Sequence, residues 1–361
     1  MAGVTRDSSV VQFGFVEEAV EWRLRSSQFP SKVGGKPSWL SLCELPGPEE
    51  LSCELCGQPC VFLLQVYAPV PEKADCFHRT VFVFCCRNVA CYSFNDRRSF
   101  KVFRSQLPRR NDFYSYDPPP DEPLDDVEGE GLGNPCGVEL CRVCGCLGPK
   151  ICSRCHVAHY CSKDHQVMDW KAGHKKSCVE GGGSKETGVS TFLFPENELV
   201  VEPEEMQPAT DPEREPESST EPAAQLAVDN ITVPDFASNC LDEKELEAMA
   251  KSESEEDKVF QHFKQRIAIE PEQVLRYSRG GSPLWVSAKN VPQQESIPHC
   301  ICGAERIFEF QVMPQLLNHL NVDTLDTSID WGTLAVYTCA ESCDTDNKYV
   351  PEFLWKQDYS H

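Results

Sequence analysis

The sequence predicts an α+β, zinc-stapled fold in which two related β-rich, zinc-ribbon-like repeats form one bipartite domain, with a small zinc finger inserted between them. Three observations predict it. Many of the 21 cysteines in the 361-residue chain stand in closely spaced pairs. One pattern of cysteines and apolar runs occurs near both ends of the chain. Two acidic, proline-containing segments separate three ordered parts.

Length and composition limit the class of protein. A chain of 361 residues has room for two or three domains. Residues 1–18 lack a secretory signal, and no stretch approaches the ~20 apolar residues that cross a bilayer. We therefore expect a soluble protein of the cytoplasm and nucleus, without a membrane partner, whose cysteines persist as thiolates on zinc rather than as disulfides.

The net charge of -23 bears on the choice of partner. Nucleic-acid surfaces cluster Lys and Arg against phosphates, so no direct nucleic-acid contact is expected. A basic protein partner fits this charge better. The alternative is that the acidity only keeps a cysteine-rich protein soluble.

The acidic segments set the domain boundaries. The order is an N-terminal repeat at 1–117, an acidic linker at 118–136, a finger at 137–180, an acidic Pro-rich linker at 181–233 and a C-terminal repeat at 234–361. Residues 196–221 hold ten acids against one base, a composition that buries too little apolar surface to order a chain. An apolar interruption, 191–195, is a candidate docking tab.

The two outer parts share one register. Cys56 and Cys302 are each followed nine positions later by a glutamine, Gln65 or Gln311, inside an apolar run. A second apolar run then ends in cysteine, and a last cysteine follows. Runs of Val, Phe and Tyr bounded by Gly, Pro and Cys favour strands, so each copy predicts a short antiparallel β unit.

Each repeat also offers a possible zinc site. The ligands expected are Cys53, Cys56, Cys86 and Cys91 in the first repeat and Cys300, Cys302, Cys339 and Cys343 in the second. Matching the second apolar runs of the two copies, 81–86 and 334–339, places Cys86 opposite Cys339 and Cys85 opposite Thr338, which favours Cys86 over Cys85 as the ligand. Buried cysteines acting as small hydrophobes would not explain why both copies keep paired spacings. The thiols left unassigned are Cys43, Cys60, Cys76 and Cys240.

Two further elements have structural interpretations. Val259, Phe260, Phe263 and Ile267 fall on one face at helical spacing, which predicts a helix packed on the core rather than a partner groove. Residues 33–37 contain adjacent glycines that permit positive φ, which predicts a turn. They lack the G-x4-G-K-[ST] spacing of a phosphate-binding loop.

The central part carries four consecutive ligand pairs. They are Cys141-x2-Cys144, Cys152-x2-Cys155, Cys161-x3-His165 and His174-x3-Cys178. A C-x2-C step brings two sulfurs onto one tetrahedral ion, so eight ligands predict two closed zinc sites without an open position for a substrate. Cys136 and Cys146 are expected to be spare thiols.

With Tyr160, Gln166 and Trp170 between the ligands, this part resembles the MYND zinc finger over some forty residues. The resemblance implies interleaved pairs: one zinc on Cys141, Cys144, Cys161 and His165, the other on Cys152, Cys155, His174 and Cys178. MYND fingers commonly place cysteine where this chain has His165. The resemblance also implies a peptide-binding surface near Gln166 and Trp170, often for Pro-rich motifs.

Outside the acidic segments, the chain resembles the programmed cell death protein 2 family. The residues that carry the resemblance are 31–40, 104–109, 111–115, 276–280 and 313–317. The family includes the yeast ribosome-maturation factor Tsr-four. It implies a dedicated chaperone for a small-subunit ribosomal protein of the S-five family, called S-two in eukaryotes, that supports delivery to the 40S precursor.

Three functions follow from these observations. The first is a chaperone seated on the repeats, with four zinc ions and an acidic surface that screens a basic client. The second is a nuclear adaptor whose MYND finger recruits transcriptional corepressors through Pro-rich peptides and influences proliferation or apoptosis. The third, a zinc enzyme, lacks any H-E-x-x-H or H-x-E deaminase signature, so no enzyme activity is expected.

Overall fold

The structure is a computed structural model that describes residues 11–18, 20–120, 122, 136–179, 182–183, 191–204, 255–322, 328–344 and 346–359. Within these ranges, no helix combines the length and the apolar character that crossing a bilayer requires.

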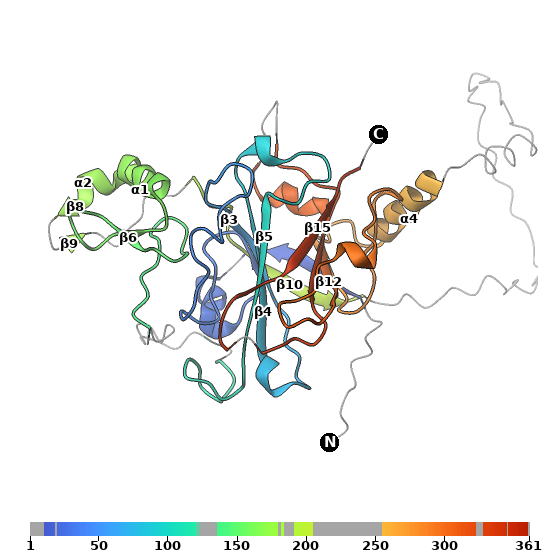
Figure 1. The fold of residues 1–361 in the computed structure, drawn as a ribbon, viewed down its shortest axis with the longest axis horizontal. Coiled ribbons are helices and arrows are strands. Elements are labelled where there is room, and N and C mark those ends of the chain that lie inside the picture. The colour runs from blue at the N-terminus through green and yellow to red at the C-terminus, as the bar shows by residue number, and fades with distance from the viewer. Residues whose placement is uncertain are drawn as a thin grey trace, which may run out of the picture.

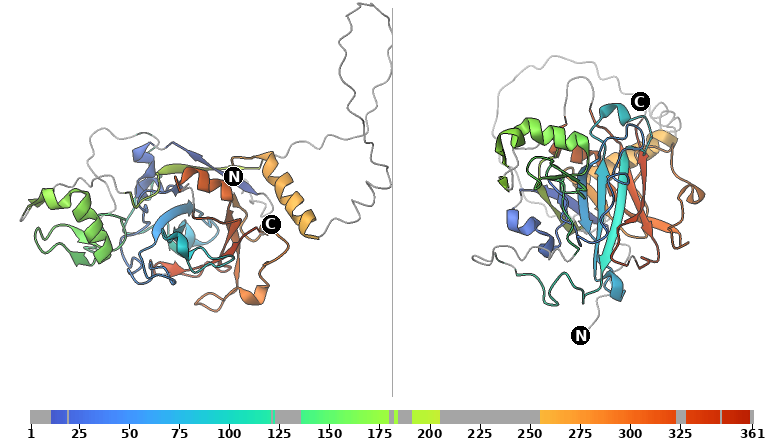
Figure 2. Two further views of the ribbon diagram at one scale, coloured as in Figure 1. Left: turned by 90° about the horizontal axis from the view of Figure 1, so that it is seen from above. Right: turned by 60° about the vertical axis from the view of Figure 1, so that its left-hand side comes forward.

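One sheet of eleven strands forms the body (Figure 1), in the order β14-β5-β4-β3-β2-β10-β1-β11-β12-β13-β15. Its strands are β1 (Gln12–Glu17), β2 (Lys32–Val33), β3 (Val61–Tyr67), β4 (His78–Cys85), β5 (Phe100–Leu107), β10 (Asn197–Pro203), β11 (Leu275–Tyr277), β12 (Arg306–Val312), β13 (Thr333–Cys339), β14 (Val350–Pro351) and β15 (Phe353–Gln357). The edge strands β14 and β15 are separated in sequence by Glu352, whose N–H donates to the Val102 carbonyl at 2.9 Å. The sheet is therefore nearly closed, and Figure 2 shows its strands arranged around a common centre.

Both faces of the central strands are buried. Every residue of β4 is buried, and so are the first six of β3. A loop that carries Trp39 covers one face, with its ring 5.1 Å from the ring of Phe82. Strands covered on both sides have continuous apolar runs rather than alternation, which explains the composition of 61–66 and 81–85.

Ion pairs inside the sheet join its two halves. Arg79 of β4 donates to Glu309 of β12 at 2.5 and 2.7 Å, and both side chains are fully buried. Arg104 of β5 donates to Glu352 at 2.7 Å. Burial alone would raise the pKa of Glu309, but the facing Arg79 holds it at about 2. The register of β12 shifts between Phe308 and Phe310, and such a bulge changes the direction of the side chain between them, that of Glu309.

The finger lies at one side of the body and the long helix at the other (Figure 1). The finger elements are β6 (Lys150–Ile151), β7 (His159–Tyr160), α1 (Lys163–Asp169), the π-helical turn η5 (Trp170–His174), α2 (Lys175–Ser177), β8 (Cys178–Val179) and β9 (Gly182–Gly183). The helix is α4 (Glu255–Ile269). Single turns are η1 (Glu21–Leu24), η2 (Ser26–Gln28), η3 (Ala74–Cys76), η4 (Val89–Cys91), η6 (Gln294–Ser296) and η7 (Pro314–His319).

The predicted helix and turn are confirmed. Phe263 of α4 is buried against Val286 and Met313, so the apolar face of α4 packs on the core. Gly34 and Gly35 have φ of 66° and 64° in the turn after β2.

The prediction of an acidic linker at 181–233 is wrong for residues 191–204. β10 is a full member of the sheet and pairs antiparallel with β1 over six residues. Leu199 is buried and the neighbouring Val200 and Val201 are half-buried, while Glu202 and Pro203 lie exposed at the end of β10. Neighbouring strands on both sides thus order a segment whose composition alone predicts a coil. Most of both predicted linkers, and Cys240, lie outside the described residues.

The interpretation of Cys43 and Cys136 as free thiols is also wrong. The two form a disulfide with Cα atoms 5.6 Å apart across 93 residues of sequence. The fold brings the loop after Trp39 next to the segment that enters the finger. The positions of these two cysteines in the sequence give no indication that they pair. The repeat organisation of the outer parts stays a prediction.

Candidate metal centres

Cysteine and histidine side chains gather into four groups, and the ligand atoms within each group lie within 4.8 Å of one another. The groups are Cys53, Cys56, Cys86 and Cys91; Cys141, Cys144, Cys161 and His165; Cys152, Cys155, His174 and Cys178; and Cys300, Cys302, Cys339 and Cys343. The structure thus brings together the four ligand sets expected from the sequence.

The spacing within the groups fits tetrahedral zinc. A Zn–S bond of ~2.3 Å places two sulfurs of one tetrahedron ~3.8 Å apart. The Sγ atoms of Cys144 and Cys161 are 3.7 Å apart, and those of Cys152 and Cys178 are 3.8 Å apart. Thiolates and imidazoles are the donors that zinc prefers. Zinc bound here would crosslink its loops, and four protein ligands leave no position for a substrate.

The N-terminal group shows why Cys86, and not Cys85, joins it. Consecutive strand residues point to opposite sides. Cys85, the last residue of β4, is fully buried, and burial raises its pKa to about 12. The Cys86 Sγ lies 3.6 Å from the Cys56 Sγ and accepts the Asn88 N–H at 3.3 Å. Burial tends to raise the pKa of Cys56, but the Gln58 backbone N–H and the neighbouring thiols lower it.

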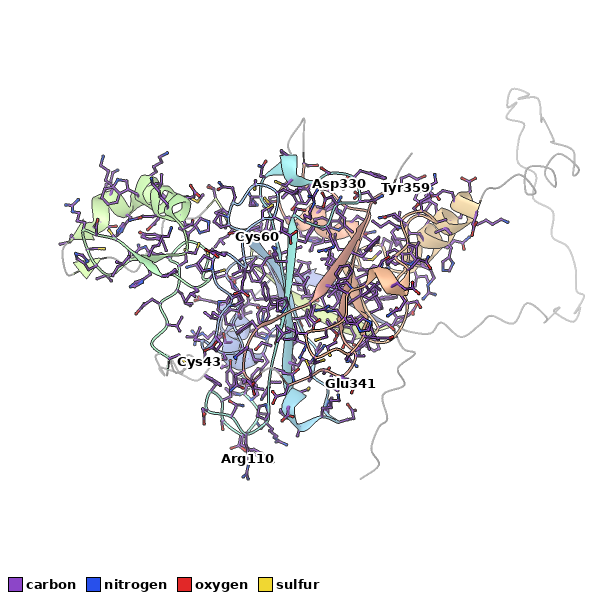
Figure 3. All side chains as sticks on the ribbon, in the orientation of Figure 1. Cys43, Cys60, Arg110, Asp330, Glu341 and Tyr359 are labelled. Atoms are coloured by element: carbon purple, nitrogen blue, oxygen red, sulfur yellow. A yellow bond between two sulfur atoms is a disulfide. The ribbon has the colours of Figure 1, made fainter. Side chains whose placement is uncertain are left out.

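The C-terminal group lies at the other end of the sheet. β4 runs from His78 to Cys85, and the N-terminal group lies just beyond the Cys85 end of the strand. Cys76, just before β4, approaches the Ser342 carbonyl beside the C-terminal group at 3.6 Å. The two outer groups are thus separated by about the eight-residue length of β4, or ~26 Å. Figure 3 shows Cys60, near the N-terminal group, high on the body and Glu341 low on it.

Strand β5 of the N-terminal half contributes to the C-terminal group. Arg104 Nη2 lies 3.4 Å from the Cys343 Sγ, and Nη1 donates to the Cys343 carbonyl at 3.1 Å. The exposed member is Cys302, whose pKa the Ala304 backbone N–H lowers to about 7. Burial raises the pKa of the Cys343 thiol to about 12, and the neighbouring Arg104 opposes this shift by favouring the thiolate, the form that binds metal.

The two groups in the finger interleave along the chain. The Ser162 hydroxyl accepts the His165 N–H at 3.1 Å and caps α1, so Cys161 precedes the helix and His165 lies in its first turn. The His165 Nδ1 is 3.1 Å from the Cys161 Sγ. The His174 Nε2 is 3.7 Å from the Cys155 Sγ. Each finger group therefore contains one histidine from the helical part of the finger, His165 of α1 or His174 of η5.

The predicted peptide-binding residues share one side of the finger. Gln166 lies in α1 and Trp170 follows its last residue, and both are half-buried. Residues four apart on a helix are neighbours on its surface. The Trp170 ring lies 5.8 Å from the ring of His174, a candidate zinc ligand at the end of the same turn η5, so the two rings pack together.

Contacts between the finger and the body were not foreseen from the sequence. The Trp39 Nε1–H donates to the Gly145 carbonyl at 2.7 Å. The Phe192 ring packs edge-on against His165 at 4.3 Å, and Arg87 stacks over Phe194 at 4.7 Å. The segment predicted as a docking tab therefore docks within its own chain, between finger and sheet.

Comparison with known protein families matches three parts of the chain. Residues 10–121 match the N-terminal domain of programmed cell death protein 2, and residues 257–358 match its C-terminal putative domain. Residues 141–178 match the MYND finger. No solved structure is significantly similar to the chain.

Similar proteins agree with these matches. Programmed cell death protein 2 of Rattus norvegicus is 53% identical over 354 residues, covering 96% of each chain. Programmed cell death protein 2-like of Mus musculus is 30% identical over 340 residues, covering 89% of this chain and 87% of that protein. Probable 20S rRNA accumulation protein 4 of Schizosaccharomyces pombe is 35% identical over 111 residues, 28% of this chain and 27% of that one. The chain is a member of the programmed cell death protein 2 family and carries a MYND finger.

Proposed function

We propose that this protein is a non-catalytic, zinc-stabilised chaperone that binds a basic small-subunit ribosomal protein of the S-five family and supports its delivery to the 40S precursor. The observation that carries the proposal is the similarity to a yeast protein whose name refers to 20S rRNA accumulation. The net charge of -23 supports the proposal, because an acidic chaperone is electrostatically complementary to a basic, RNA-binding protein.

The four metal groups support a structural rather than a catalytic use of zinc. Each supplies four protein ligands, and a catalytic zinc keeps one position for water or substrate. We infer that the chain binds four zinc ions, one in each outer group and two in the finger.

The two outer parts act in this proposal as a pair of repeats with a joint binding surface. Two observations support the pairing. β3 shifts register between Phe62 and Leu64, and β12 shifts between Phe308 and Phe310, at positions that the glutamine alignment equates. Gln65 and Gln311 are both almost fully buried and hydrogen-bonded to loops next to their strands.

The test is affinity purification of the tagged full-length chain from cells, followed by native mass spectrometry. We expect the ribosomal protein and four zinc ions to co-purify, with an association that weakens as salt rises. Deleting residues 234–361 is not a usable test, because it removes five strands from the shared sheet. Absence of the ribosomal protein at low salt, from a chain with its full zinc content, would contradict the proposal.

A second candidate is a nuclear adaptor that binds Pro-rich corepressor peptides through the finger. The neighbouring Gln166 and Trp170 on one side of the finger favour it. Trp170→Ala should abolish adaptor function and leave the ribosomal protein bound. Complementation of cells depleted of the protein separates the two functions, and fractionation of the same cells tests the proposed presence in both cytoplasm and nucleus.

A further inference from the structure

The Cys43–Cys136 disulfide joins the body of the protein to the start of the finger. Figure 3 shows Cys43 on the side of the body where the finger lies. Cys136 stands shortly before Cys141, the first candidate zinc ligand of the finger. Neither cysteine of the disulfide belongs to any of the four metal groups, so forming or breaking this bond removes no candidate zinc ligand.

The loop that presents Cys43 is fixed to the sheet. The Trp39 ring packs edge-on against the Tyr349 ring, with 5.0 Å between their centroids. The Tyr349 hydroxyl donates to the Ser41 carbonyl at 2.8 Å and accepts the Ser41 N–H at 3.1 Å. The Ser41 hydroxyl accepts the Cys43 N–H at 3.0 Å. Cys43 is therefore held in place by contacts that do not involve the disulfide.

Non-covalent contacts place the finger beside this loop. The Trp39 Nε1–H donates to the Gly145 carbonyl at 2.7 Å. A cavity of about 70 Å³ remains between body and finger, with Leu51 on the side of the body and Cys161 on the side of the finger. Atoms that line a void lose packing contacts. The interface therefore aligns the two cysteines, and a covalent link can stabilise it further.

The disulfide is open to attack by small thiols, because Cys136 is exposed and Cys43 is half-buried. Disulfides are rare in the cytosol, where glutathione keeps thiols reduced, and those that occur are usually transient and catalytic or redox-sensing. The proposed presence of this chain in cytoplasm and nucleus therefore favours a bond that forms and breaks over a permanent one.

We propose that Cys43 and Cys136 form a redox site whose disulfide locks the finger on the body and whose reduction opens this lock. The co-reactant is a small thiol of the glutathione class. Reduction frees the face of the finger that contacts Trp39. The proposal rests on the compartment proposed above and does not depend on the ribosomal client.

The reaction is thiol–disulfide exchange in two steps. The thiolate of one glutathione attacks the exposed Cys136 sulfur, the bond to Cys43 breaks, and Cys43 leaves as a thiolate that takes up a proton. A second glutathione thiolate attacks the glutathione sulfur of the mixed disulfide, and Cys136 leaves as a thiolate in the same way. The chain gains two thiols, and the two glutathione molecules leave as one disulfide. The reverse steps close the lock with glutathione disulfide as the oxidant.

Docking of the finger and oxidation of the pair are linked. The docked finger holds the two Cα atoms 5.6 Å apart, within the range that a disulfide spans. With the bond open, residues 121–135 join the body to the start of the finger, and a chain of that length can extend to ~50 Å. Docking therefore raises the effective concentration of one thiol at the other. By reciprocity, the disulfide strengthens docking by the same factor by which docking favours the disulfide.

The first test is a redox titration of the full-length, zinc-loaded chain in glutathione buffers, with differential alkylation and mass spectrometry to count the oxidised pair. We expect the Cys43–Cys136 bond to form and break reversibly at a constant zinc content. Phe192→Ala removes a ring that packs on His165 of the finger, and should lower the equilibrium constant for oxidation by at least ~tenfold. Val167→Ala, at an exposed position of α1, is the control and should leave that constant unchanged.

The second test measures the lock itself. The Trp39 indole N–H bonds across the interface, so its exchange with solvent reports opening between body and finger. We expect oxidation to slow this exchange by at least ~tenfold, as followed by NMR of the chain labelled at tryptophan. Cys136→Ser should exchange at the rate of the reduced chain in both buffers.

Three results would overturn the proposal. One is a pair that stays reduced in the most oxidising glutathione buffer. Another is a disulfide that persists at the glutathione ratio of the cytosol, which would make it a permanent crosslink. The third is a disulfide that forms but leaves Trp39 exchange unchanged, which would mean that it locks nothing. None of these measurements involves the ribosomal protein, so the function proposed above stands or fails separately.

Discussion

The buried pair Arg79–Glu309 offers a test of whether the two halves form one folding unit. Arg79 lies in β4 and Glu309 in β12, 230 residues later. Arg79→Met leaves the Glu309 carboxylate buried without its main partner, and Glu309→Met leaves the guanidinium unpaired. Breaking such a pair costs about 3–5 kcal/mol of unfolding free energy. The double variant, with Met at both positions, leaves neither charge of the pair behind. The Tyr277 and Thr338 hydroxyls, which donate to Glu309, then lose their acceptor, and each lost hydrogen bond costs about 1 kcal/mol of unfolding free energy.

The double variant should therefore cost about 2 kcal/mol, far below the sum of the single variants. The assay is reversible urea unfolding followed by tryptophan fluorescence, at fixed zinc and reductant concentrations, with coincident near-UV circular dichroism as the two-state control. A coupling energy below about 0.5 kcal/mol would show independent sites and refute the reasoning.

Three further perturbations have defined outcomes. Cys86→Ser should lower the zinc count in native mass spectrometry by one, whereas Cys85→Ser should leave it unchanged; equal counts in both variants would contradict the ligand choice. Phe192→Ala should weaken docking of the finger by about 3 kcal/mol and accelerate proteolysis between finger and sheet, with the zinc count as control. Burial, aided by Arg109, lowers the pKa of His78 to about 4. Because the unfolded-state value is ~6.5, stability should fall by up to ~1.4 kcal/mol per pH unit from 6.5 towards 4; His78→Phe should remove this slope, and an unchanged slope would refute the assignment.

The metal-ligand groups could be predicted because their signal is local. A pair such as Cys141-x2-Cys144 encodes its own turn, and the resemblance to a known finger supplies the interleaving. The choice of Cys86 over Cys85 came from matching the two apolar runs that end in cysteine, and it agrees with the alternation of side chains along β4. Individual ligand residues can therefore be predicted from the sequence wherever the spacing of the ligands constrains the backbone.

The rest depends on partners distant in sequence. β10 was missed because the acids around Leu199 outweigh its apolar residues in any window, and the neighbouring strands that order it come from residues 12–17 and 32–33. Nothing near Arg79 or Arg104 indicates full burial, since arginine is almost never fully buried unless paired. Their partners lie more than two hundred residues away. The closure of the sheet is likewise a property of the whole chain.

The C-terminal metal group ties these observations together. Its ligand Cys343 accepts from Arg104 of β5, and the Cys339 N–H donates to Glu352 at 3.3 Å. Arg104 and Glu352 also bond each other at the point where β14 and β15 close the sheet. Residues that hydrogen-bond to metal ligands orient those ligands and strengthen metal binding. Since Arg104 comes from the N-terminal half, closure of the sheet brings this partner to the C-terminal group. Zinc bound at this group would favour the closed sheet, because a ligand that binds one state preferentially stabilises that state. It would then link the two halves of the chain rather than stabilise a separate ribbon.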